Sequence, residues 1–75
     1  MQGIINDLSE KTGINTEFFV HSNYALYHGG GVIVLIEDLG DDTGKVLVRK
    51  AGDDLANEQT TNLTDAVLIG VTATK

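Results

Sequence analysis

The residues of this chain that could take part in chemistry are few, and the two histidines stand out among them. His21 and His28 are seven residues apart, and Glu17 lies four residues before the first. Imidazole and carboxylate groups bind metals, but a metal site needs three or four ligands that converge in space. On one continuous strand, an odd separation turns the two imidazoles to opposite faces. The spacing therefore favours two ordinary histidines, and we expect neither a metal nor another cofactor.

Three consecutive glycines, Gly29-Gly30-Gly31, follow the second histidine. Together with His28 they superficially resemble the glycine-rich oxyanion-hole segment of lipases and esterases, but the chain has no Gly-x-Ser-x-Gly nucleophile elbow. The run also lacks the Gly-Lys-Ser/Thr of a phosphate-binding loop, and an apolar strand pattern rather than a helix follows it. A tight turn is the better interpretation, because glycine adopts positive φ without strain.

Acidic residues occur in adjacent pairs, of which Glu37-Asp38 and Asp41-Asp42 are closest together. The spacing that follows Asp41 or Asp42 does not match a calcium-binding EF-hand loop. Consecutive strand residues point to opposite faces, so Glu37 and Asp38 do not form a catalytic pair. No serine can be connected by sequence with a histidine and an aspartate. We therefore expect no catalytic residues and a protein that is not an enzyme.

Two apolar runs around a polar turn organise the rest of the chain. Val32–Ile36 is apolar at every position, and Lys45–Arg49 alternates, with Val46 and Val48 on one side. The intervening Leu39–Gly44 is rich in the turn residues aspartate and glycine, so the pattern predicts a β-hairpin. Because its first strand is apolar on both sides, we expect both faces of that strand to be covered.

The other segments carry weaker patterns. Gln2–Thr12 has helical spacing and precedes Gly13, which suits a left-handed helix cap. Asn15–His28 contains all four aromatic residues and favours two short strands over the alternative of a helix. Leu55–Asn62 is polar and indicates a loop, whereas Ala66–Thr74 is rich in β-branched residues and indicates a strand.

These elements predict a single domain, residues 1–75, of the β-rich α+β class. We expect a small antiparallel sheet or barrel of about four or five strands, with one short N-terminal helix. Ile33, Leu35 and Leu68 are expected on a second apolar face. The residues expected in the core are Ile4, Ile5, Leu8, Phe19, Val20, Leu26, Val32, Val34, Ile36, Val46, Val48, Val67 and Ile69.

Composition limits the function classes. Seventy-five residues without cysteine form one small domain that has no disulfide to stabilise it. The short chain and the lack of disulfides therefore favour association with a second copy or a partner, and a small domain that folds alone is an equal alternative. The net charge of −6 argues against direct nucleic-acid binding and fits a partner with a basic surface. No apolar run is long enough to cross a bilayer, so we expect a soluble cytoplasmic protein.

The first functional hypothesis is a non-enzymatic, self-associating β module, an assembly or structural accessory whose small size would suit a viral protein. The alternatives are an acidic inhibitor that blocks the nucleic-acid-binding surface of a basic partner protein, and an oligomer that binds a small ligand between subunits. The residues expected to contribute to binding are Tyr24, Tyr27, His28, Gly29, Gly30, Gly31, Glu37, Asp38, Asp41 and Asp42.

Overall fold

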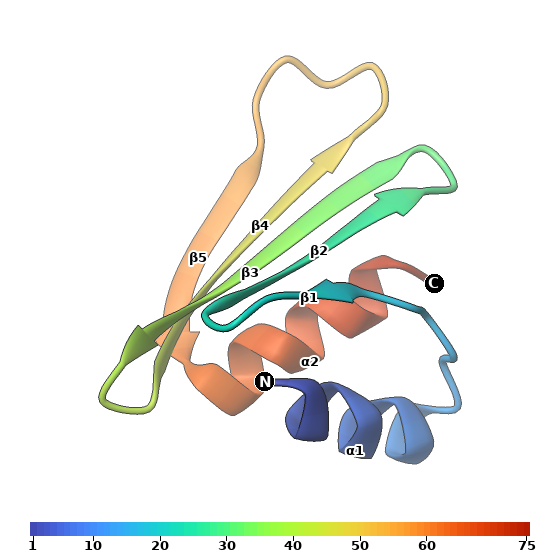
Figure 1. Ribbon diagram of the computed structural model, residues 1–75. Helices are drawn as coiled ribbons and strands as arrows, with labels where there is room; N and C mark the ends of the chain where they lie inside the picture. Colours follow the sequence, from blue (N-terminus) through green and yellow to red (C-terminus); the bar gives the residue numbers. More distant parts are fainter.

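The computed structural model describes residues 1–75 and contains one five-stranded antiparallel sheet and two helices (Figure 1). The strands follow the chain order β1-β2-β3-β4-β5, so that each strand pairs with its neighbours in sequence. Both helices lie on the same side of the sheet. The elements are α1 (Gln2–Thr12), β1 (Phe19–Val20), β2 (Tyr24–Gly29), β3 (Val32–Gly40), β4 (Thr43–Lys50), β5 (Asn57–Asn62) and α2 (Leu63–Ala73).

The predicted hairpin is confirmed as β3 and β4. Its turn consists of Asp41 and Asp42, which both have positive φ, 51° and 60°. Two positive φ values characterise the type I′ turn, whose twist matches that of the flanking strands. Gly30 and Gly31 form the equivalent two-residue turn between β2 and β3, with φ of 57° and 78°. The glycine run is therefore a tight turn.

The C-terminal prediction of a strand at Ala66–Thr74 is wrong, because this part of the chain belongs to α2. Asn62 caps the N-terminus of this helix: its side-chain oxygen accepts a hydrogen bond from the backbone N–H of Asp65 at 2.8 Å. Its buried residues follow the spacing i, i+3, i+4, i+7, i+8, which places them on one face. Burial of this face outweighs the strand preference of the β-branched side chains. The buried residues are Leu63, Ala66, Val67, Gly70 and Val71.

Two further expectations need correction. Asn57–Asn62, expected to be part of a loop, forms the edge strand β5, which pairs with β4 from Val48 to Thr43. The side chains of β5 are polar, so the sequence shows no alternation of apolar residues that would predict a strand. Backbone pairing with β4, rather than burial of side chains, defines this strand. The sheet is open and not a barrel, because β1 and β5 lie at opposite edges. The chain has two helices and not the single helix that was predicted, since α2 is present in addition to α1. The predicted helix α1 ends, as expected, before the left-handed Gly13.

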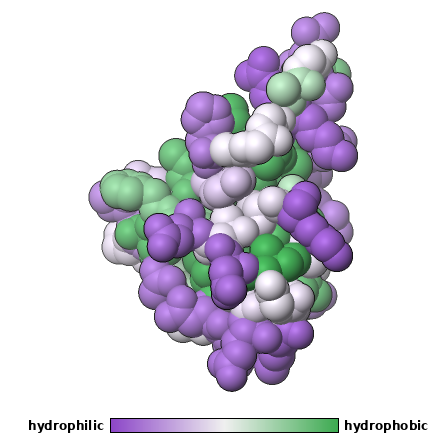
Figure 2. Space-filling view, turned by 90° about the vertical axis from the view of Figure 1, so that its right-hand side faces the viewer, coloured by the Kyte–Doolittle hydropathy of each residue, from purple (hydrophilic) through white to green (hydrophobic).

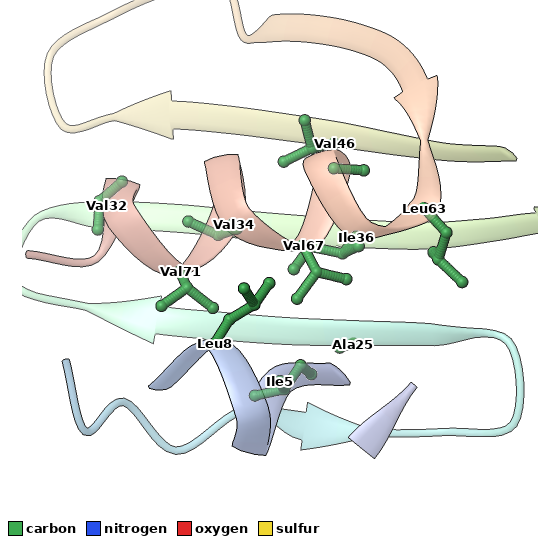
Figure 3. Close-up of a cluster of buried hydrophobic side chains, with 11 residues drawn as sticks. Ile5, Leu8, Ala25, Val32, Val34, Ile36, Val46, Leu63, Val67 and Val71 are labelled. Atoms are coloured by element: carbon green, nitrogen blue, oxygen red, sulfur yellow. The ribbon is translucent and has the colours of Figure 1, made fainter. Parts of the chain in front are cut away.

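The core lies between the sheet and the helices (Figure 3). α2 packs on β3 and β4, and α1 packs against α2. Of the predicted core, Phe19 and Leu26 are wrong, since they are 63% and 37% exposed. Alternation along β2 explains this error, because Ala25 rather than Leu26 faces the helices. The buried residues are Ile5, Leu8, Ala25, Val32, Val34, Ile36, Val46, Leu63, Ala66, Val67 and Val71, with Ile4, Val20, Val48 and Ile69 partly buried beside them.

Two glycines allow α2 to approach the sheet closely. A Cβ atom added to Gly44 of β4 would lie 2.9 Å from Cβ of Ala66 and 3.0 Å from Cα of Leu63. A Cβ atom added to Gly70 of α2 would lie 2.5 Å from Cδ1 of Ile36. The helix therefore rests directly on the sheet backbone at one end and on core side chains at the other.

Candidate protein-binding face

The side of the sheet opposite the helices has no element of the chain over it (Figure 1). We call this side the open face. Because strand side chains alternate, the open face receives every second residue of each strand, in phase with Leu35 of β3. Apart from Thr43 and Asn62 beside the β3–β4 turn, its residues are Phe19, Tyr24, Leu26, His28, Ile33, Leu35, Glu37, Lys45, Leu47, Arg49, Glu58 and Thr60.

A row of four apolar side chains crosses the middle of the open face. Phe19 of β1 pairs with Leu26 of β2, Leu26 pairs with Leu35 of β3, and Leu35 pairs with Leu47 of β4. Cross-strand partners have neighbouring side chains, so the four residues form one continuous strip, which we call the apolar row. Leu35 and Leu47 are half-buried by their neighbours, whereas Leu26 and Phe19 are more exposed.

An aromatic group extends this strip at the β1 edge. The His21 ring lies 4.8 Å from the Phe19 ring in an edge-on arrangement and 4.9 Å from the Tyr24 ring, on which it stacks. The Tyr24 ring belongs to the open face and stands opposite Glu37 of β3. The three rings therefore enlarge the open face at this edge, and none of them carries a carboxylate or an amine.

Charged side chains flank the apolar row on both sides. On one side lie Glu37 and Lys45, and Lys45 forms an ion pair of 2.6 Å with Glu58. The hydrogen bond and the negative charge of Glu58 raise the pKa of Lys45 above its ordinary value, and Glu37 adds to the effect. On the other side lies Arg49, which Ile33 separates from the imidazole ring of His28. An apolar centre with a charged rim is the usual anatomy of a protein interface.

The two ends of the sheet differ in charge. At the β3–β4 turn, the Leu63 N–H donates to the Asp42 carbonyl at 2.8 Å, which brings the start of α2 beside the turn. This end, which we call the acidic end, combines the carboxylates of Glu37, Asp38, Asp41, Asp42 and Asp65. The opposite end carries the cations Arg49 and Lys50 at the end of β4, followed by Asp53 and Asp54 in the β4–β5 connection. Figure 2 shows that connection as the mostly hydrophilic projection at the top of the molecule.

The structure does not bring the predicted binding residues together in one site. Tyr24, His28 and Glu37 lie on the open face, as part of its rim. Tyr27 lies on the helix side, where its ring is 5.8 Å from that of Phe18 and covers Gly29. The remaining predicted residues divide between the two ends of the sheet: Gly29, Gly30 and Gly31 at one, and Asp38, Asp41 and Asp42 at the other.

Sequence reasoning missed three members of the apolar row, namely Phe19, Leu26 and Leu47. A signal for Leu47 was present, because Lys45, Leu47 and Arg49 alternate with buried valines and thus share a face. The expected second apolar face is confirmed for Ile33 and Leu35, whereas Leu68 lies on α2.

No three histidine, aspartate or glutamate side chains are grouped so that they could hold a metal ion. Neither helix has the length and apolar character needed to span a membrane. Comparison of the chain with models of protein families, with curated proteins and with solved structures yields no match.

Proposed function

We propose that this protein is a non-enzymatic, self-associating α+β module whose open face packs against the open face of a second copy. The observation that carries the proposal is the apolar row, which runs in register across four strands with nothing over it. Burial of such side chains is favourable by about 25 cal/mol for each Å² of apolar surface removed from water. Face-to-face packing would give four layers, with the helices outside and the two sheets inside.

The dimensions of the open face support one interface of ordinary size. Four strands about 4.8 Å apart with about six residues each at 3.3 Å, together with the two residues of β1, cover on the order of 400 Å² in projection. Protruding side chains make the accessible area larger than its projection. Stable protein–protein interfaces bury about 800 Å² on each partner, which a face of this extent approaches.

The test compares two equal substitutions on opposite sides of the molecule. Leu35→Asp places a carboxylate in the middle of the apolar row, where a second copy would have to desolvate it. Leu68→Asp makes the same change on α2, where the leucine is 36% exposed. Sedimentation equilibrium should show dimers for the wild type and for Leu68→Asp, and monomers for Leu35→Asp.

Circular dichroism of dilute samples distinguishes loss of association from loss of folding. Leu35→Asp should retain its folded spectrum, because the side chain points away from the core. A wild-type protein that sediments as a monomer at all concentrations would contradict the proposal, as would a Leu35→Asp variant that dimerises like the wild type.

An acidic inhibitor of a basic protein is the second candidate function. The acidic end favours it, because the hydrogen bond between Leu63 and Asp42 adds the Asp65 carboxylate to those of the hairpin. Its test is the recovery of a partner from lysate by wild-type protein and by an Asp41→Asn/Asp42→Asn variant. Binding that depends on these carboxylates and weakens with salt would support this function, and binding indifferent to both would contradict it.

A further inference from the structure

We infer that the outer edge of β5, together with a groove beside α2, binds an extended segment of another protein, which adds to the sheet as a sixth strand. The partner carries large apolar residues at alternate positions and a lysine or arginine in front of them. This surface lies at the edge and on the helix side of the sheet. The inference therefore goes beyond the proposed self-association through the open face and does not depend on it.

β5 is a long and unprotected edge strand. It pairs with β4 over six residues in continuous register, whereas β1 at the opposite edge has only two residues (Figure 1). Natural sheets protect their edges with lysine, proline, bulges or very short strands. β5 has no lysine, proline or bulge, and its one charged residue, Glu58, is paired with Lys45. The edge is therefore open to a further strand.

The backbone of β5 presents free hydrogen-bonding groups along this edge. The Leu63 N–H donates to the carbonyl of Asp42, which places these two residues in a hydrogen-bonded pair at the end of the β4–β5 ladder. Such pairs recur at every second residue of an antiparallel ladder, so the odd-numbered residues of β5 turn their N–H and C=O groups to β4. The N–H and C=O groups of Glu58 and Thr60 therefore point outward, where an antiparallel strand would pair with them.

A groove of about 330 Å³ lies beside this edge, between β5 and α2. Its apolar residues are Val46, Val48 and Ile69, of which Val48 and Ile69 are only half-buried, and its polar residues all belong to β5. In strand addition, backbone hydrogen bonds supply affinity and pockets for alternate side chains supply specificity. Every second side chain of an added strand would point to the helix side, so the groove selects apolar residues at alternate positions.

A second copy of β5 does not fit this requirement. The side chains of β5 on the helix side are Asn57, Gln59 and Thr61, the cross-strand partners of the β4 residues that face α2. Paired with the edge of another copy, they would place amides and a hydroxyl over Val48 and Ile69. The groove would then have no apolar occupant, so it indicates a partner of different sequence.

The acidic end lies beside the point where β5 ends. Asp42 and Asp65 lie next to Asn62 there, and Asp65 is hydrogen-bonded to it. Lys45, on the adjacent part of β4, is already paired with Glu58. An antiparallel partner would begin its strand beside Asn62, so a lysine or arginine in front of its apolar residues would meet carboxylates that no cation balances.

The other end of β5 has no excess of charge. Arg49 and Lys50 end β4 there, and Asp53 and Asp54 follow in the connection to β5. Charge therefore favours a basic residue at only one end of the partner, the end at which the antiparallel strand begins.

Two synthetic peptides of equal composition test the site. Both begin with two lysines, and leucine alternates with serine in one, whereas the leucines are adjacent in the other. The alternating peptide should bind the isotope-labelled protein saturably and should slow hydrogen exchange at the amides of Glu58 and Thr60, which make no bond to β4. The peptide with adjacent leucines should bind about tenfold more weakly or worse, because it cannot fill the groove while it pairs with the edge.

A proline substitution tests the edge itself. Thr60→Pro removes an outward N–H, and proline is tolerated in an edge strand where its nitrogen faces solvent. This variant should retain its folded circular dichroism spectrum and lose binding of the alternating peptide. Binding that Thr60→Pro leaves unchanged would contradict strand addition at β5.

A matched pair of substitutions on α2 tests the groove. Ile69→Gln removes an apolar side chain from the groove and should weaken peptide binding about tenfold. Leu68→Gln makes the same change at the neighbouring position, which does not line the groove, and should bind like the wild type. Equal affinities for the two variants would overturn the role of the groove.

The open-face variant separates this site from self-association. Leu35→Asp should bind the alternating peptide as tightly as the wild type, whether or not the wild type is a dimer. No binding of the alternating peptide, equal binding of both peptides, or protection confined to β1 or to the open face would overturn the site at β5. None of these results would affect the proposed dimer, which sedimentation tests.

Discussion

The two faces of β3 are built from the same kinds of residue over Val32–Ile36 but differ in burial. On β3, Val34 and Ile36 face the helices and are fully buried, whereas Ile33 and Leu35 face the other way and remain partly exposed. The difference arises from the helices, both of which lie on one side. A strand apolar on both faces is typical of a sheet covered on both sides, and this chain supplies only one of the two covers. The apolar residues on both faces of β3 therefore mark a second face that the helices leave partly exposed.

The largest contrast between the faces should appear when their central residues are truncated. Ile36→Ala removes a fully buried side chain and should reduce the free energy of unfolding by about 3 kcal/mol. Leu35→Ala, one residue earlier on the open face, should reduce it by less than about 1 kcal/mol in dilute monomer. Urea unfolding at low concentration measures both values. Equal losses would mean that the open face is as important to the monomer as the core.

The next largest loss of stability is expected where α2 packs closely against the helix-covered face of the sheet. Gly44→Ala inserts a methyl group against Cα of Leu63 and should destabilise the fold by about 1–3 kcal/mol. Gly3→Ala is the control, because a Cβ atom there meets nothing within 4 Å and alanine favours the helix by about 1 kcal/mol. Thermal melts should therefore shift in opposite directions. A Gly44→Ala protein as stable as the wild type would show that the helix does not rest on the strand.

The β3–β4 turn belongs to neither face, so a change there should alter stability without altering association. Asp42 adopts a φ of 60°, which glycine tolerates better, and Asp42→Gly should stabilise the protein by about 0.5 kcal/mol. Asp54→Gly removes the same charge where φ is not positive and should give no such gain. Urea melts report the stability, and a higher midpoint for Asp54→Gly than for Asp42→Gly would be inconsistent with this account of the turn.

The smallest effect is expected at the rim of the open face. The raised pKa of Lys45 reflects its ion pair with Glu58, and a raised lysine pKa stabilises the folded state below the ordinary lysine pKa of about 10.4. This contribution is lost as the pH rises through the raised value. Glu58→Gln should therefore lower the melting temperature slightly at neutral pH, and its difference from the wild type should vanish at strongly alkaline pH. A difference that grows with pH would contradict this assignment.

Much of the fold could be predicted where the local pattern and the tertiary environment agree. Val32–Ile36 and Lys45–Arg49 carry strand residues around a turn, and Gly13 and Gly30 stand where positive φ is required. α2 could not be predicted from its β-branched residues, because packing against the sheet decides its conformation. Its i, i+3, i+4 spacing after the helix-capping Asn62 was the available signal.

The open face was only partly predictable for a different reason. Ile33 and Leu35 lie opposite the buried residues of their own strand, so alternation alone places them. Phe19 and Leu26 lie beside Leu35 because of the pairing register between β1, β2 and β3. That register is set by the geometry of the turns, and it cannot be deduced from the pattern of apolar residues. The apolar row therefore exists only in the folded sheet.

Methyl resonances measured over a dilution series test the central claim most directly. The methyl groups of Leu26, Leu35 and Leu47 should shift with protein concentration, because a second copy covers them only in the dimer. The methyl resonances of Val34, Ile36 and Val46 should keep their chemical shifts at all concentrations, since the helices cover these side chains in monomer and dimer alike. Concentration-dependent shifts confined to α2 or β5, or no shifts at all, would contradict the account.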